Sequence, residues 1–77
     1  MPTVTELCAV IEAAVHAPPG SLHPDTELPH VKGMDSMALV WLLGELGARW
    51  GVVLSVDDVS GCRTPTDLHR VLVPHAG

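Results

Sequence analysis

The stretch that most constrains this chain runs from Gly33 to Gly51 and reads GMDSMALVWLLGELGARWG. Read as a helix, it is apolar on two sides. One face has the spacing i, i+3, i+4, i+7 and i+11 that is typical of a helix packed on a core: Leu39, Leu42, Leu43, Leu46 and Trp50. A second face, called the Trp41 face, repeats that spacing: Met37, Val40, Trp41, Gly44 and Ala48. The only charges between the two faces are Glu45 and Arg49.

The length of the chain decides how this helix can be placed. A helix that is apolar all round is ordinarily central in a large core or in a membrane. Seventy-seven residues are too few to surround a central helix completely. We therefore expect the Trp41 face to be at least partly exposed, and an exposed apolar patch marks a surface where a partner docks. The alternative is that the other helices and a long loop cover this face.

Composition and charge limit the class of protein. Hydrophobic residues make up 47% of the chain, which excludes a disordered tail, and the length allows one domain over residues 1–77. Nine acidic against four basic residues give a formal net charge of −5, so we expect no nucleic-acid partner. The most apolar span contains Glu45 and Arg49, so we expect no membrane partner. No basic start or apolar run follows Met1, and we expect a cytoplasmic protein.

The two cysteines, Cys8 and Cys62, lie among apolar neighbours, and we interpret both as small core side chains. A disulfide-stapled secreted domain usually carries more cysteines. No C-x-x-C pair or cysteine–histidine cluster is present, so we expect no metal site.

Start and stop signals predict an all-α fold, a small four-helix bundle with three main helices and a short third helix. The first helix begins near Thr3 or Thr5 and stops before the prolines that follow Ala17. Its apolar stripe has helical spacing: Leu7, Ile11, Ala14 and Val15. A long loop without periodicity follows, up to Met34. Three apolar residues are expected to hold this loop on the core: Leu22, Leu28 and Val31.

The second helix is the longest. Asp35 or Ser36 caps its start, and Gly51 ends it. The segment Ser55-Val56-Asp57-Asp58 resembles a capping box with Asp in place of Glu, and it opens a short third helix. Gly61 ends that helix.

The last helix has the clearest start signals: Thr64 as the cap, Pro65 at the first helical position and Asp67 in the first turn. Its buried stripe is formed by Leu68, Val71 and Leu72. Pro74 ends it. No stretch alternates with period two for long enough to predict a sheet.

Ser36 stands out because it lies at the head of the longest helix. A serine there is most often only a cap. Here Asp35 can supply the cap, which frees the Ser36 hydroxyl, and Gly33 lets the backbone turn sharply or approach closely. A helix start offers unpaired N–H groups and partial positive charge, which suit a phosphate group. A phosphodiester on Ser36 would also lie beside the Trp41 face.

Gly33-Met34-Asp35-Ser36-Met37 resembles the G-x-D-S-[L/M] signature of acyl carrier proteins. Three further segments are similar to motifs of that family: PDTEL at 24–28, WGVVLSVDDV at 50–59 and RTPTDLHRVL at 63–72. The five-residue signature alone is weakly specific. Together with the length and the helix pattern, the signature and the other motifs extend the resemblance over nearly the whole chain. The chain is therefore similar to a freestanding acyl carrier protein.

The resemblance implies a function and a set of partners. In the family, the residue matching Ser36 receives 4′-phosphopantetheine from coenzyme A through a magnesium-dependent phosphopantetheinyl transferase, and the residue matching Asp35 assists. The thiol of the arm then holds acyl or aminoacyl groups as thioesters, and the carrier itself catalyses nothing. A loading enzyme, either a ligase or an acyltransferase, supplies these groups, and a downstream synthase or transferase accepts them.

The helix that matches the second helix is the docking surface of the family. The resemblance therefore assigns partner docking to one set of residues: Met37, Val40, Trp41, Gly44, Glu45 and Ala48. We expect the protein to be a monomer.

The second helix departs from the pattern of many fatty-acid carriers, which place several acids there for basic partners to recognise. Here small and aromatic residues occupy that region, and Glu45 is almost the only acid. We expect weak electrostatic steering and docking through apolar contact around Trp41. The resemblance then favours a carrier of a specialised polyketide, nonribosomal-peptide or hybrid pathway, with a peptidyl or aminoacyl carrier as the alternative.

Other classes of function stay open from the residues alone. A hydrolase would use Ser36 as nucleophile and a histidine as base, but no G-x-S-x-G motif is present and a small bundle has little room for a pocket. A helical interaction module or a homodimer would instead close over the Trp41 face. A helix lying on a membrane surface is disfavoured because its polar face lacks the usual Lys and Arg residues.

Overall fold

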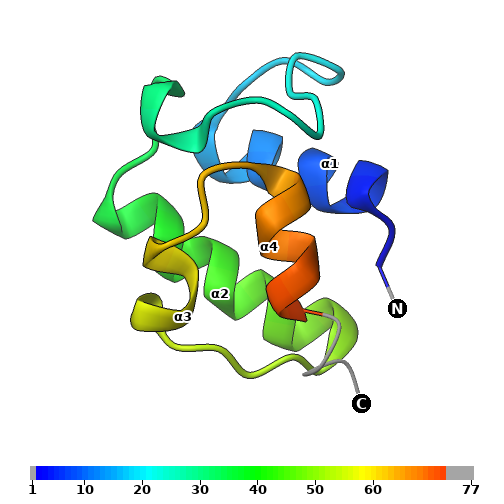
Figure 1. The fold of residues 1–77 in the computed structure, drawn as a ribbon, viewed down its shortest axis with the longest axis vertical. Helices are drawn as coiled ribbons and strands as arrows, with labels where there is room; N and C mark the ends of the chain where they lie inside the picture. The colour runs from blue at the N-terminus through cyan, green and yellow to red at the C-terminus, as the bar shows by residue number, and fades with distance from the viewer. Residues whose placement is uncertain (1, 73–77) are drawn as a thin grey trace.

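The computed structural model describes residues 2–72, and these form helical segments with no strand among them. Their order is α1 (Val4–Val15), the 3-10 turn η1 (Leu28–His30), α2 (Ser36–Trp50), α3 (Val56–Ser60) and α4 (Pro65–Leu72). Helix α1 packs against α2 and α4, and α3 packs against the same two helices (Figure 1). The predicted all-α fold with three main helices and a short third one is confirmed.

Helix α1 begins where the sequence predicts, because Thr3 and Glu6 form a reciprocal capping box. Thr3 Oγ1 accepts from the Glu6 N–H at 3.1 Å, and the Glu6 carboxylate accepts from the Thr3 N–H at 3.0 Å. The helix ends at His16, whose backbone has the left-handed φ of 58° that few residues other than glycine adopt. Three residues of the predicted apolar stripe are buried: Leu7, Ile11 and Val15. The fourth, Ala14, is half-buried.

The loop that joins α1 to α2 arches over one side of the molecule (Figure 1). Leu22 and Leu28 are buried as predicted. The buried Glu12 carboxylate accepts from the Leu22 N–H at 2.9 Å, which fixes the loop to α1. Val31, the third residue expected to hold the loop on the core, packs against the core and is half-buried, because it also lines a surface hollow beside the end of α1.

Helix α2 is capped by Asp35 at its start and ends at Gly51, whose φ is 66°. Its buried stripe is Ala38, Leu42 and Leu46. The predicted core face was too wide, because α2 packs mainly against two helices, α1 and α3, which cannot cover so broad a surface. Three of its predicted members pack on the core but are only half-buried: Leu39, Leu43 and Trp50.

Helices α3 and α4 begin at their predicted caps. Ser55 Oγ accepts from the Asp58 N–H at 3.2 Å, and Thr64 Oγ1 accepts from the Asp67 N–H at 3.1 Å. In the predicted α4 stripe, Leu68 and Leu72 are buried, and Val71, at the edge of the stripe, is half-buried. Pro74, the predicted end of α4, lies outside the described residues.

The two thiols are free and lie inside or against the core. Cys8 is buried, and Cys62 is half-buried. Burial raises the pKa of both thiols, so both stay protonated at neutral pH and are weak nucleophiles. In the described part of the chain, no three His, Cys, Asp or Glu side chains gather as metal ligands. Over the same residues, no helix has the length and apolarity that a membrane span requires.

Candidate functional site

The segment before α2 is held against the end of α1 by Gly33. Its φ of +90° disfavours any residue with a side chain, and a Cβ there would lie 3.0 Å from the Val15 carbonyl oxygen. A methyl group would therefore need the backbone to shift. The sequence predicted that this glycine allows a sharp turn or a close approach, and in the structure it provides both.

Asp35 is the residue that caps α2. Its carboxylate accepts from the Ala38 N–H at 2.9 Å, and its carbonyl accepts from the Leu39 N–H at 3.0 Å. Ser36, the other candidate cap, is the first residue of the helix and is exposed. Its hydroxyl makes no hydrogen bond to any group within residues 2–72. The Ser36 Oγ is therefore available for reaction.

The start of α2 is suited to a phosphate group. The first N–H groups of a helix have no intrahelical partner and carry partial positive charge. The N–H groups of Ser36 and Met37 bond to nothing else in the described part of the chain. No acidic residue lies in the first turn of α2, and the adjacent carboxylate, that of Asp35 at the cap, accepts a hydrogen bond from the Ala38 N–H. A phosphodiester on Ser36 would lie in this favourable field.

The Trp41 face is exposed, as the length of the chain predicts. Met37 is 81% exposed, Val40 61% and Trp41 43%. The remaining two members, Gly44 and Ala48, are exposed as well. Ser36 borders this face and helps to line an open hollow of ≈ 400 Å³. A serine that is free to react thus lies next to an exposed apolar surface.

Glu45 is the only acidic residue of α2, and it is paired within the helix. Its carboxylate lies 2.8 Å from the Nε of Arg49, one turn further on. The two charges cancel, and α2 contains no other charged side chain. The helix therefore offers a partner an apolar surface with no net charge.

The family model described as "Phosphopantetheine attachment site" matches residues 5–72, which include Ser36 and all of α2. The chain belongs to the acyl carrier protein family. The resemblance expected from the Gly33–Met37 signature is confirmed. No curated protein sequence gives a significant match to the carrier.

Two solved structures share the fold of the carrier. Holo acyl carrier protein from Geobacter metallireducens has a TM-score of 0.76 and 16% identity, over 97% of this chain and 86% of that one. Oxytetracycline acyl carrier protein has a TM-score of 0.73 and 23% identity, over 97% of this chain and 82% of that one. These similarities establish the fold of the carrier.

Membership of the family identifies 4′-phosphopantetheine as the prosthetic group. The free hydroxyl and the unpaired N–H groups at the start of α2 fit a phosphodiester at this position. Carriers of the family are not enzymes; they interact with phosphopantetheinyl transferases and with biosynthetic enzymes. The hydrolase alternative is therefore wrong. Among residues 2–72, no histidine is hydrogen-bonded to Ser36 Oγ as a catalytic base would be.

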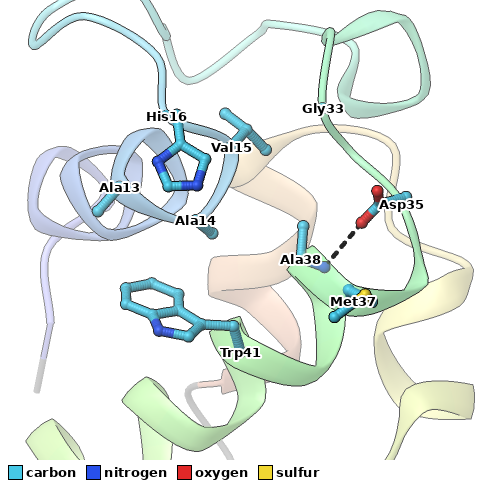
Figure 2. A pocket seen from close by; sticks show the side chains of 9 residues that line it. All are labelled: Ala13, Ala14, Val15, His16, Gly33, Asp35, Met37, Ala38 and Trp41. Atoms are coloured by element: carbon cyan, nitrogen blue, oxygen red, sulfur yellow. Dashed lines mark hydrogen bonds between the residues drawn. The ribbon is translucent and has the colours of Figure 1, made fainter.

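One part of the site was not predicted from the sequence. A groove of ≈ 420 Å³ lies between the end of α1 and the start of α2 (Figure 2). The end of α1 supplies one wall: Ala13, Ala14, Val15 and His16. In Figure 2 the indole of Trp41 reaches from α2 toward this wall. Helical spacing shows which residues share a face of one helix, but it does not show which residues of two helices lie opposite each other.

Proposed function

We propose that Ser36 carries the 4′-phosphopantetheine arm and that the carrier holds acyl or aminoacyl groups on this arm as thioesters. The observation behind this proposal is the Ser36 hydroxyl, which is exposed and free of hydrogen bonds at the first position of α2. Two neighbours support the assignment. Asp35 takes the cap, and Gly33 fixes the segment that leads into the helix.

In the transfer step, Ser36 Oγ attacks the phosphorus of coenzyme A that bears the pantetheine arm. The Oγ–P bond forms, the P–O bond of the diphosphate breaks, and 3′,5′-ADP leaves with the bonding electron pair. The serine proton passes to a base of the phosphopantetheinyl transferase. One carboxylate oxygen of Asp35 makes no hydrogen bond within residues 2–72, and we propose that it binds the magnesium ion that neutralises the diphosphate.

The pathway that we propose is a specialised one of polyketide or nonribosomal-peptide type. Partners with a basic patch would gain little from α2, because its only acid is paired with Arg49. One protein with the same fold is named for oxytetracycline, which agrees with this proposal. The loading enzyme and the downstream synthase or transferase would then dock on the apolar surface around Trp41. The docking residues are Met37, Val40, Trp41, Gly44, Glu45 and Ala48.

Intact mass spectrometry tests the attachment site. After incubation with coenzyme A, magnesium and a broad-specificity phosphopantetheinyl transferase, the wild type is expected to gain one phosphopantetheine mass. Ser36→Ala is expected to gain none, while Ser60→Ala, which removes another exposed helical serine, gains the same mass as the wild type. Because Asp35 keeps the cap, Ser36→Ala should cost less than about 1 kcal/mol of stability and stay helical by circular dichroism. Modification of Ser36→Ala would refute the assignment.

A further inference from the structure

The groove between α1 and α2 lies beside the proposed attachment site. On its α1 side, Ala13 and Ala14 have short side chains that leave the groove open. On its α2 side stands the indole of Trp41, with 43% of the residue exposed (Figure 2). His16 lines the groove where α1 ends, and its left-handed φ of 58° is uncommon outside glycine.

The groove lies next to the hollow that adjoins Ser36. Met37 and Trp41 line both of them. A group that is attached to Ser36 and lies across Trp41 therefore enters the groove and approaches α1. The volume of ≈ 420 Å³ lies within the range of about 300–1,000 Å³ that is usual for small-molecule sites.

We propose that the 4′-phosphopantetheine arm on Ser36 rests in the groove between α1 and α2, against the Trp41 indole. This placement rests on the proposed attachment to Ser36. The arm combines methyl and methylene groups with a hydroxyl and two amides. The apolar surfaces of Ala13, Ala14 and Trp41 suit the hydrocarbon parts, and the imidazole of His16 offers a polar partner for the amides.

Because the arm is attached to the carrier, even a weak affinity for the groove is enough to keep the arm there for much of the time. A short flexible tether holds its ligand at an effective concentration in the millimolar range. A groove that would bind the free arm with a Kd of about 1 mM would hold the tethered arm about half of the time. A partner enzyme that docks on Trp41 covers the same indole, so docking and resting of the arm exclude each other.

The two tryptophans allow this placement to be measured. Trp50→Phe leaves Trp41 as the only tryptophan. This variant would be converted from the apo to the holo form with transferase, coenzyme A and magnesium, under a reductant that keeps thiols free. We expect the emission of Trp41 to change on conversion, together with the NMR amide shifts of Ala13 and Ala14.

A matched pair of variants tests whether the groove causes this change. Ala13→Leu, made in the Trp50→Phe background, places a larger side chain in the groove, and it should remove at least half of the emission change. Ala9→Leu makes the same replacement at an exposed residue one turn earlier on α1, outside the groove, and should preserve the change. Both variants should be modified like the parent, as intact mass shows.

The outcomes separate this placement from the proposed function. Full conversion by mass without any change at Trp41, Ala13 or Ala14 would overturn the placement and leave Ser36 as the attachment site. Shifts confined to α3, at Val56 and Val59, would put the arm on another side of α2 and overturn it as well. Failure of the transferase to modify the protein at all would instead overturn the proposed function.

Discussion

The two faces of α2 have similar hydrophobicity but lie in opposite environments. Leu46 is fully buried, and Leu42 is almost so, whereas Met37 is 81% exposed and Val40 is 61% exposed. The difference comes from the neighbours, because Leu42 and Leu46 belong to the buried core cluster, whereas Met37 and Val40 do not pack on it. In so small a domain, an apolar side chain stabilises the fold where a neighbouring helix covers it. Where no neighbouring helix covers the apolar side chain, it stays exposed and can contact a partner.

This comparison separates two kinds of free energy. Burying a leucine side chain stabilises the folded state by about 1.5–3 kcal/mol relative to leaving it exposed. Met37 and Val40, which are mostly exposed, make little such contribution to folding, and the same gain becomes available when a partner covers them. Substitutions on the two faces should therefore alter different measurements, stability for one and recognition for the other.

The largest effect is expected from Leu46→Ala on the core face. Removal of this fully buried side chain should lower the free energy of unfolding by about 2–5 kcal/mol. Since a small domain has a total stability of only about 5 kcal/mol, the variant is expected to be largely unfolded, as urea titration followed by circular dichroism would show. Val40→Ala, on the exposed face of the same helix, should change stability by less than about 0.5 kcal/mol. Equal stabilities for the two variants would contradict the claim that one face of α2 is core and the other is not.

A smaller effect, and one on recognition instead of folding, is expected from Trp41→Ala. Truncating a central aromatic anchor costs about 2 kcal/mol or more in binding, which is roughly thirtyfold in affinity. The variant should remain helical and still be modified on Ser36, while its loading by the partner acyl- or aminoacyl-transferring enzyme weakens mainly through a higher apparent KM.

Val53→Ala is the control for this change, because Val53 is an exposed valine outside α2. It should load like the wild type. Unchanged loading of Trp41→Ala, or loss of its helicity, would show that this tryptophan serves another role.

The smallest effect is expected from salt. The Debye length falls from about 10 Å at 0.1 M to about 3 Å at 1 M, so an interface that depends on exposed charges weakens as salt rises. Because Glu45 is already paired with Arg49, loading of the wild type should change by less than about twofold across this range. A tenfold loss would show that acids elsewhere on the carrier guide its partners.

The helix ends could be predicted from the sequence because their signals are local. Thr3 with Glu6, and Ser55 with Asp58, form their capping boxes within one turn, and each needs nothing from the rest of the chain. Gly51 ends α2 for the same reason. The sequence left two candidates for the cap of α2, Asp35 and Ser36. The hydrogen bond from the Ala38 N–H to the Asp35 carboxylate decides for Asp35.

The width of the core and the wall of the groove could not be predicted, because both depend on how helices lie beside one another. Leu43 and Trp50 have core spacing on α2 but are only half-buried, since no neighbour covers that side fully. Ala14 has core spacing on α1 yet lines the groove opposite Trp41. Spacing within one helix carries no information on either arrangement.

The measurement that tests the account most directly is the location of the modification in the wild-type protein. After conversion to the holo form, proteolysis and tandem mass spectrometry would assign the phosphopantetheine mass to one residue. We predict that all of it lies on Ser36, at one group per chain. Attachment to any other hydroxyl, such as those of Ser21, Ser55 or Ser60, would contradict the claim that the free hydroxyl at the head of α2 carries the function.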